Sequence, residues 1–253
     1  MSFLNIIGIE LQKIKRSKIV LIISLPSLIV IISGLANIGM YITDNPSNAW
    51  SAMFVQSTLM FAYYMMPFSI IILCVLISQT EYQNKGIIKM LSLPIDTKKL
   101  SFAKYCVIVI LIAVQILLYF VFFTVGGIIT SSLVGINIII PIGYLLSWCV
   151  KLFLAALPMS AVLWATATCF KKIITSLSIG MALVLPSIFV SNTRFWFIYP
   201  FNYPGILISD EMFKLAGSTR APMQLIPFIP VAIFICIIAV TISTIQFGKI
   251  ETN

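Results

Sequence analysis

Charged side chains, the groups best suited to chemistry in this chain, are concentrated between residues 78 and 105. This stretch reads SQTEYQNKGIIKMLSLPIDTKKLSFAKY and contains five lysines together with Glu81 and Asp96, although only 9% of the 253 residues are charged. Glu81, Lys85 and Lys89 follow one another at intervals of four residues. A glutamate that precedes a lysine by four residues stabilises a helix, so this spacing predicts a polar stripe along a short helix.

The apolar residues of the same segment fall on the other side of that helix. Ile87, Met90 and Leu91 spread over the surface that the polar stripe leaves. Pro94 ends the helix, and residues 96–97 can cap a second helix that runs into the next apolar segment. The pattern indicates either a docking helix or a simple connector held in place by its lysines.

Residues for enzymatic chemistry are missing from the sequence. There is no histidine among the 253 residues, which excludes histidine-based zinc sites and Ser-His or Cys-His catalysis. None of the 12 glycines belongs to a G-x-x-x-x-G-K-[ST] motif. The five cysteines are scattered through apolar runs. We therefore expect no catalytic residue, no metal and no cofactor bound by this chain, and no ATP hydrolysis of its own.

The composition places the chain in a membrane. Hydrophobic residues make up 60% of the sequence and the mean hydropathy is +1.11, well above the values of soluble domains. Crossing a bilayer takes about 20 apolar residues. The sequence therefore predicts an all-α integral membrane protein with six transmembrane helices, at residues 19–41, 59–79, 105–130, 141–170, 173–190 and 226–247.

The net charge of +9 reflects membrane topology, so we expect no nucleic-acid partner. Most lysines and arginines flank alternate runs on one side, which predicts cytoplasmic N- and C-termini. Residues 1–18 carry apolar side chains at helical spacing and end in a basic cluster, which predicts an amphipathic helix on the membrane surface. A frayed tail is the alternative. The apolar positions are Phe3, Leu4, Ile7, Leu11 and Ile14.

The charged loop also resembles a known family. It is similar to the intracellular loop of type-2 ABC transporter permeases, and the whole chain looks like the permease subunits of lantibiotic-immunity and antimicrobial-peptide-resistance exporters. The residues that carry the resemblance are Glu81, Asn84, Gly86, Lys89, Leu91, Ser92, Leu93, Pro94, Ile95, Lys99, Leu100 and Lys104.

The resemblance implies one permease domain over residues 1–253, with an interfacial helix (1–18), a cytoplasmic coupling loop (80–104) and an outer re-entrant loop (191–225). It implies that the coupling helix docks on a separate ABC ATPase subunit, present in two copies, which binds ATP and Mg²⁺. A second permease subunit, identical or homologous, completes the complex. The residues assigned to the contact with the ATPase are Glu81, Lys85, Gly86, Ile87, Lys89, Met90, Leu91 and Pro94.

Aromatic residues are dense in the outer loop, where residues 194–205 read RFWFIYPFNYPG. One interpretation is an aromatic belt at the membrane interface. The other is a shelf that meets an amphipathic cationic peptide by stacking and cation–π contacts. Trp196 and Tyr199 would then contact the peptide, and Asp210 and Glu211 would attract its charge.

Lys151 lies within the fourth apolar run, where a lysine is either functional or extended to the membrane surface.

The expected function is export of lantibiotic-type peptides from the plasma membrane of a Gram-positive bacterium, with the lipid bilayer and the peptide as partners. Alternatives are export of another drug or lipid, as in bacitracin resistance, and a membrane sensor or scaffold that recruits a cytoplasmic protein.

Overall fold

The computed structural model describes residues 3–15, 19–36, 49–83, 97–134, 141–170, 172–215 and 225–248. Every regular element within these ranges is a helix. The long elements are α2 (Ile19–Ala36), α4 (Ala49–Met60), α5 (Met66–Gln83), α7 (Thr97–Val134), α8 (Ile142–Cys169), α9 (Ile173–Val184) and α12 (Leu225–Gly248). The shorter ones are α1 (Phe3–Lys15), the π-helix η2 (Phe61–Met65), α10 (Ser187–Ser191), the 3-10 turns η3 (Trp196–Ile198) and η4 (Pro200–Asn202), and α11 (Tyr203–Leu215).

Six helical segments are long and apolar enough to cross a membrane, which confirms the predicted all-α class and the number of spans among the described residues. They are Ile19–Ala36, Met53–Gln79, Thr97–Ile129, Ile142–Cys169, Ile173–Ser191 and Pro227–Phe247. The second span begins earlier than residue 59, because α4, η2 and α5 form one continuous helical rod. The predicted helix start near residues 96–97 is confirmed, since α7 begins at Thr97.

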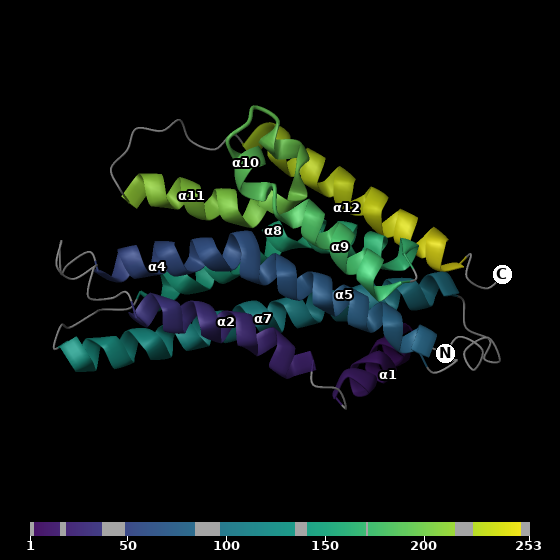
Figure 1. The fold of residues 1–253 in the computed structure, drawn as a ribbon, viewed down its shortest axis with the longest axis horizontal. Coiled ribbons are helices and arrows are strands. Elements are labelled where there is room, and N and C mark those ends of the chain that lie inside the picture. Colours follow the sequence, from purple (N-terminus) through teal and green to yellow (C-terminus); the bar gives the residue numbers. More distant parts are fainter. Residues whose placement is uncertain are drawn as a thin grey trace.

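The spans run roughly parallel to one long axis, as Figure 1 shows. At one end of the bundle lie α1, the end of α5, the start of α7 and the last turns of α12; we call this the α1 end. At the opposite end lie the start of α4, the end of α7 and α11; we call this the α11 end. The predicted cytoplasmic location of the termini corresponds to the α1 end and stays a prediction.

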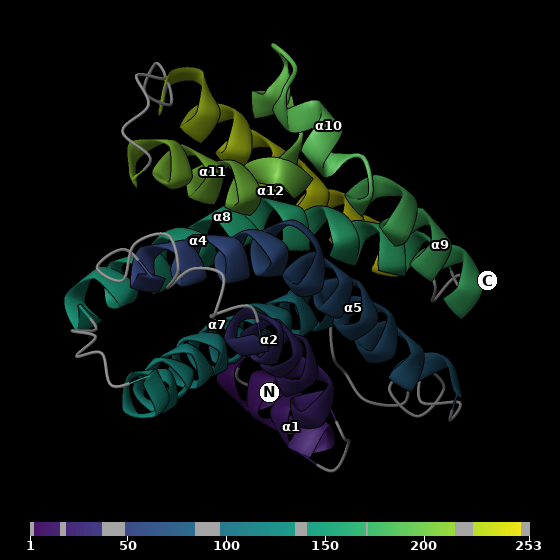
Figure 2. The ribbon, with the colours of Figure 1, turned by 60° about the vertical axis from the view of Figure 1, so that its left-hand side comes forward.

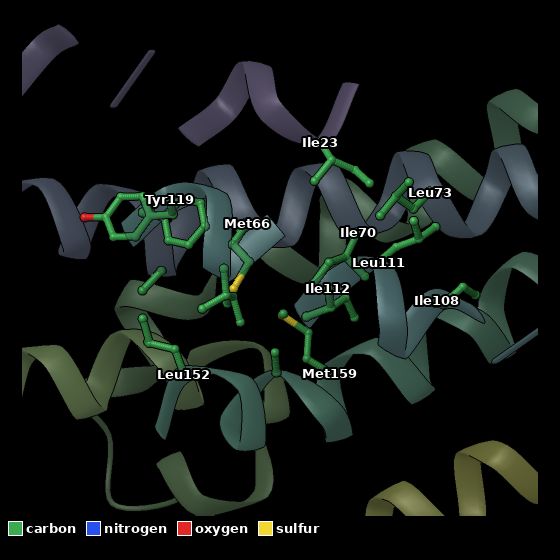
Figure 3. Close-up of a cluster of buried hydrophobic side chains, with 14 of the residues drawn as sticks. Ile23, Met66, Ile70, Leu73, Ile108, Leu111, Ile112, Tyr119, Leu152 and Met159 are labelled. Atoms are coloured by element: carbon green, nitrogen blue, oxygen red, sulfur yellow. The ribbon is translucent and has the colours of Figure 1, made fainter. Parts of the chain in front are cut away.

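The core lies where α2, α5, α7 and α8 meet. Figure 3 shows Ile23, Met66, Ile112 and Met159 converging there, and all four side chains are fully buried. Between spans in lipid, close packing and interhelical hydrogen bonds provide most of the association energy. Tyr105 of α7 donates such a bond to the carbonyl of Leu157 in α8, at 3.2 Å. α7 runs from the α1 end to the α11 end, and this hydrogen bond ties it to α8 between the two ends.

The N-terminal segment is helical over Phe3–Lys15, and its predicted place on the membrane surface stays a prediction. The protein-facing side of this helix includes residues that the apolar pattern left out. Ile6 and Glu10 are buried, whereas Leu4 is 75% exposed. Ile6 packs with Leu100 and Ala103 of α7. Thus α1 lies against the start of α7, and the side that carries Leu4 faces outward.

At the α11 end the chain turns back after α10. Figure 2 shows α10, α11 and the start of α12 gathered on one side of the bundle. The turns η3 and η4 lead into α11, and residues 200–205 are all buried. These short elements form the described part of the predicted outer loop and position the site below.

Candidate functional site

Tyr63 connects the second span to the outer segment at the α11 end. Its hydroxyl donates a hydrogen bond to Ser191 Oγ of α10 at 3.1 Å and shares another with Ser209 Oγ of α11 at 3.2 Å. Its ring lies against Gly205, where an added Cβ would come within 2.3 Å of ring carbons. Only glycine allows this approach, so Tyr63 and Gly205 together fix how closely α11 packs on the second span.

The π-helix η2 places Tyr63 in this position. A π-helical turn contains an extra residue and often occurs at functional sites. Phe61, its first residue, stacks on Tyr119 of α7 with ring centroids 4.1 Å apart and an interplanar angle of 11°. The Tyr119 hydroxyl shares a hydrogen bond with Thr58 Oγ1 at 2.9 Å. Packing against α7 thus holds the irregular turn in place.

A pocket of about 960 Å³ opens beside this turn. α4 and η2 form one wall, and α10, the turn after it and α11 form the other. The size lies within the range of small-molecule sites. Both aromatic and charged side chains line the pocket, among them Tyr63, Tyr64, Arg194, Trp196 and Asp210.

Two of the four residues proposed to contact a peptide, Trp196 and Asp210, line this pocket. The other two are engaged elsewhere. The Tyr199 hydroxyl donates a hydrogen bond to the Leu183 carbonyl of α9, and the Tyr199 ring lies 5.3 Å from that of Phe201. Glu211 accepts a hydrogen bond from the Tyr144 hydroxyl of α8 at 2.7 Å. Thus Tyr199 attaches the turn before α11 to α9, and Glu211 attaches α11 to α8.

The acidic residues of α11 share a lysine. Lys214 Nζ lies 2.7 Å from Asp210 and 3.9 Å from Glu211. Bonding to Asp210 raises the pKa of Lys214 above its ordinary value, so Lys214 is charged at neutral pH. The Lys214 side chain is 60% exposed, and such exposed pairs add little stability. The positive charge of Lys214 nevertheless compensates the negative charge of Asp210.

Tyr203 supports the turn that presents Trp196. Its buried hydroxyl donates to the Phe197 carbonyl at 2.6 Å, and its ring meets Phe228 of α12 edge-on at 4.7 Å. Burial raises the pKa of Tyr203 to about 12, so the hydroxyl keeps its proton and continues to donate at physiological pH. The Trp196 ring lies tilted by 34° against the same Phe228, with ring centroids 5.7 Å apart. Phe228 therefore supports the indole of Trp196, which also lines the pocket.

A second cluster of charges, which the sequence did not reveal, lies at the α1 end. Glu10 of α1 lies 2.7 Å from Lys104 of α7 and 2.6 Å from Lys13. The Lys104 side chain is 0% exposed and that of Glu10 is 4% exposed. Lys104 is seven residues beyond Thr97, the first residue of α7. A buried ion pair thus joins α1 to α7 next to the charged loop.

A signal for this pair does exist in the sequence. Glu10 lies four residues after Ile6 and four before Ile14, so it falls on one helix face with two apolar residues that are both buried. A carboxylate in such a position needs a cationic partner. Spacing alone does not indicate which of the lysines supplies it.

The coupling loop falls largely outside the described residues. This applies to Lys85, Gly86, Ile87, Lys89, Met90, Leu91 and Pro94. The backbone of Glu81 belongs to the last turn of α5, which ends at Gln83. The assigned ATPase contacts therefore stay predictions, and the structure describes only the helices on either side.

Lys151 lies in α8, which runs without a break from Ile142 to Cys169. Its side chain is exposed, and Nζ lies 4.4 Å from the centroid of the Trp148 ring. This cation–π contact accommodates the charge on the outer surface of the span. Within the described ranges, no group of three or more Cys, Asp or Glu residues could hold a metal ion.

A comparison with protein families relates this arrangement to known proteins. The family model for ABC-2 family transporter proteins matches residues 6–187, from α1 through the first five spans to the start of α10. No curated protein and no solved structure matches the chain. The match covers more than half of the sequence and agrees with the multi-pass helical fold. The chain therefore belongs to the ABC-2 family of transporter proteins.

Proposed function

We propose that this chain is the permease subunit of an ATP-driven exporter that removes lantibiotic-type antimicrobial peptides from the plasma membrane of a Gram-positive bacterium. Membership of the ABC-2 family supports the permease role. The observation that favours an amphipathic cargo is the pocket at the α11 end, which combines aromatic rings, hydroxyl groups and two charged side chains. Such a lining suits a molecule that is partly apolar and partly polar.

The peptide would contact the pocket chiefly through Trp196. The indole is partly buried, held against Phe228 and exposed on the pocket side, so it offers a fixed aromatic face to a lysine or an aromatic residue of the peptide. Attraction by Asp210 and Glu211 is weaker in this proposal, because Lys214 and Tyr144 already bind them. Aromatic contact therefore dominates over charge.

ATP is bound and hydrolysed by a partner in this proposal. Two ABC ATPase subunits dock on the loop between α5 and α7, and a second permease subunit completes the complex. The Glu10–Lys104 pair supports such a role, since it ties the start of α7 to α1 close to the docking loop. A push on the loop would then move α1 and α7 together.

Replacing Trp196 by alanine tests the peptide contact. We expect cells that express the exporter with its ATPase to lose protection against a lantibiotic-type peptide roughly three- to tenfold, the loss of one aromatic contact. Phe195→Ala is the matched control, because Phe195 is adjacent, 65% exposed and outside the pocket lining. Equal protection in both variants, at equal membrane abundance, would contradict the peptide site.

Two other functions share the same fold. Export of another drug or lipid predicts that Trp196→Ala leaves peptide protection unchanged but impairs resistance to a different compound. A membrane sensor or scaffold predicts that peptide does not stimulate ATP hydrolysis by the purified complex. Exporter function predicts such stimulation and its loss in Glu81→Ala and Gly86→Trp, so the ATPase assay separates the two classes.

A further inference from the structure

The pocket lies beside the ends of two candidate membrane spans. The fifth span ends at Ser191, and Asn192, Thr193 and Arg194, the next residues, all line the pocket. The second span begins at Met53 on the same side, and Gln56, near its start, also lines the pocket. Apolar helices give way to polar residues at the headgroup layer. One side of the pocket is therefore at headgroup depth and the other reaches the acyl chains.

The charge that remains available in the pocket is positive. Its charged lining residues are Arg194 and Asp210. Asp210 is bonded to Lys214 at 2.7 Å, whereas among the described residues no carboxylate pairs with Arg194. An arginine with its planar set of donors is well suited to a phosphate group. The charged side chains of the pocket thus suit an anionic group, whereas a cationic group would depend on the aromatic face of Trp196.

Hydrogen-bond donors in the pocket lead to the same conclusion. The hydroxyls of Ser191, Thr193 and Ser209 already donate to helix carbonyls. Ser191 and Ser209 also contact the Tyr63 hydroxyl, so each keeps one lone pair for a ligand, and Thr193 keeps both. Within the described part of the chain, the side-chain N–H groups of Arg194, Gln56 and Trp196 have no acceptor. A phosphate accepts from such N–H groups, and hydroxyl groups beside it can donate to the serine and threonine oxygens.

Apart from Asn192 and the hydroxyls of Tyr63 and Tyr64, the remaining lining is apolar. Leu59 and Met60 come from α4, Ile188 from α10, and Ile206 and Met212 from α11. These side chains offer contact to a glycerol backbone and the first carbons of an acyl chain. A free inorganic anion would leave this half of the pocket without a partner.

We propose that this pocket binds the headgroup of an anionic glycerophospholipid, with its phosphate at Arg194, headgroup hydroxyls at the serine and threonine oxygens, and its upper acyl chains along α4 and α11. The lipid site goes beyond the proposed peptide export and does not depend on it. A peptide that enters the pocket has to displace this lipid.

Lipid retention by the purified full-length chain tests the proposal. The protein is exposed to equimolar phosphatidylglycerol and phosphatidylcholine with identical acyl chains, and lipid retained by the folded protein is measured by native mass spectrometry. We expect about tenfold preference for phosphatidylglycerol, the effect of one charge-assisted hydrogen bond. Arg194→Gln should abolish the preference, and Arg194→Lys should keep part of it.

Lys172→Gln is the matched control, because Lys172 is exposed and lies at the other end of α9. It makes the same change in charge and should keep the full preference. Equal retention of both lipids by the native protein, or the same result for Arg194→Gln and Lys172→Gln, would overturn the proposal. Displacement of the lipid by millimolar inorganic phosphate would also overturn it, since it would identify a site for free phosphate. A peptide-transport assay is not involved, so the two proposals can fail separately.

Discussion

The two ends of the bundle use charged residues in opposite ways. At the α1 end, Glu10 and Lys104 form an ion pair that is closed off from solvent. At the α11 end, Lys214 is 60% exposed where it bonds Asp210, beside a pocket of about 960 Å³. The first arrangement joins two helices, and at the second no carboxylate of the described residues pairs with Arg194. The difference indicates a rigid α1 end and a receptive α11 end.

The cost of desolvation explains why the inner pair matters. A buried ion pair often contributes no more stability than apolar residues of the same volume, but an unpaired buried charge is strongly destabilising. The Glu10–Lys104 pair therefore contributes little net stability. Its main effect is to specify that α1 docks on α7. Lys214 carries a smaller penalty, because its side chain is 60% exposed to solvent.

The largest expected effect comes from Lys104→Met. The substitution leaves Glu10 buried with Lys13 as its remaining partner among the described residues. We therefore expect a loss of about 3 kcal/mol in the free energy of unfolding, at the lower end for a broken buried pair. Unfolding of the purified protein in detergent measures it. The double variant Glu10→Leu with Lys104→Met should come within about 1 kcal/mol of the native protein. A double variant no more stable than the single one would contradict the ion-pair explanation.

A smaller effect is expected for Gly205→Ala at the other end. The new methyl group would overlap the Tyr63 ring, and such overpacking costs about 1 to 3 kcal/mol. Gly143→Ala is the control, since an added Cβ there meets no atom within 4 Å. Thermal unfolding of both variants provides the measurement. If Gly205→Ala is as stable as Gly143→Ala, the close packing of Tyr63 on α11 is not a constraint.

The smallest effect is expected for Lys214→Met, which makes the same substitution as Lys104→Met but at an exposed pair. After solvent screening we expect a change below about 1 kcal/mol, which decreases further with added salt. Unfolding at low and high ionic strength measures it. Equal losses for Lys214→Met and Lys104→Met would remove the contrast between the two ends.

The sequence predicted local features well and tertiary ones poorly. Continuous apolar runs located all six spans, and Thr97 could be identified as the start of α7 from the residues around Pro94. The partner of Glu10 could not be predicted, because Lys104 lies 94 residues away and competes with other lysines. The π-helix also escaped prediction, since its first residue, Phe61, is held by Tyr119 from another span.

The candidate site was predicted only in part, because its residues also depend on tertiary contacts. Aromatic density pointed to Trp196, which does line the pocket, but also to Tyr199, whose hydroxyl binds α9. Arg194 was missed as a site residue, because the sequence does not show that the nearby carboxylates Asp210 and Glu211 bond to Lys214 and Tyr144. The family match ends at residue 187, so α11 and its half of the pocket lie beyond it.

Photo-crosslinking of the peptide tests the central claim that the α11 end receives the cargo. A photoreactive phenylalanine analogue is placed at position 196 or, as control, in place of the exposed Phe102 at the α1 end, and cells are illuminated with a lantibiotic-type peptide. We expect a peptide adduct from position 196 that increases when ATP is depleted, and none from position 102. Adducts from position 102 alone, or from neither position in a protective exporter, would contradict it.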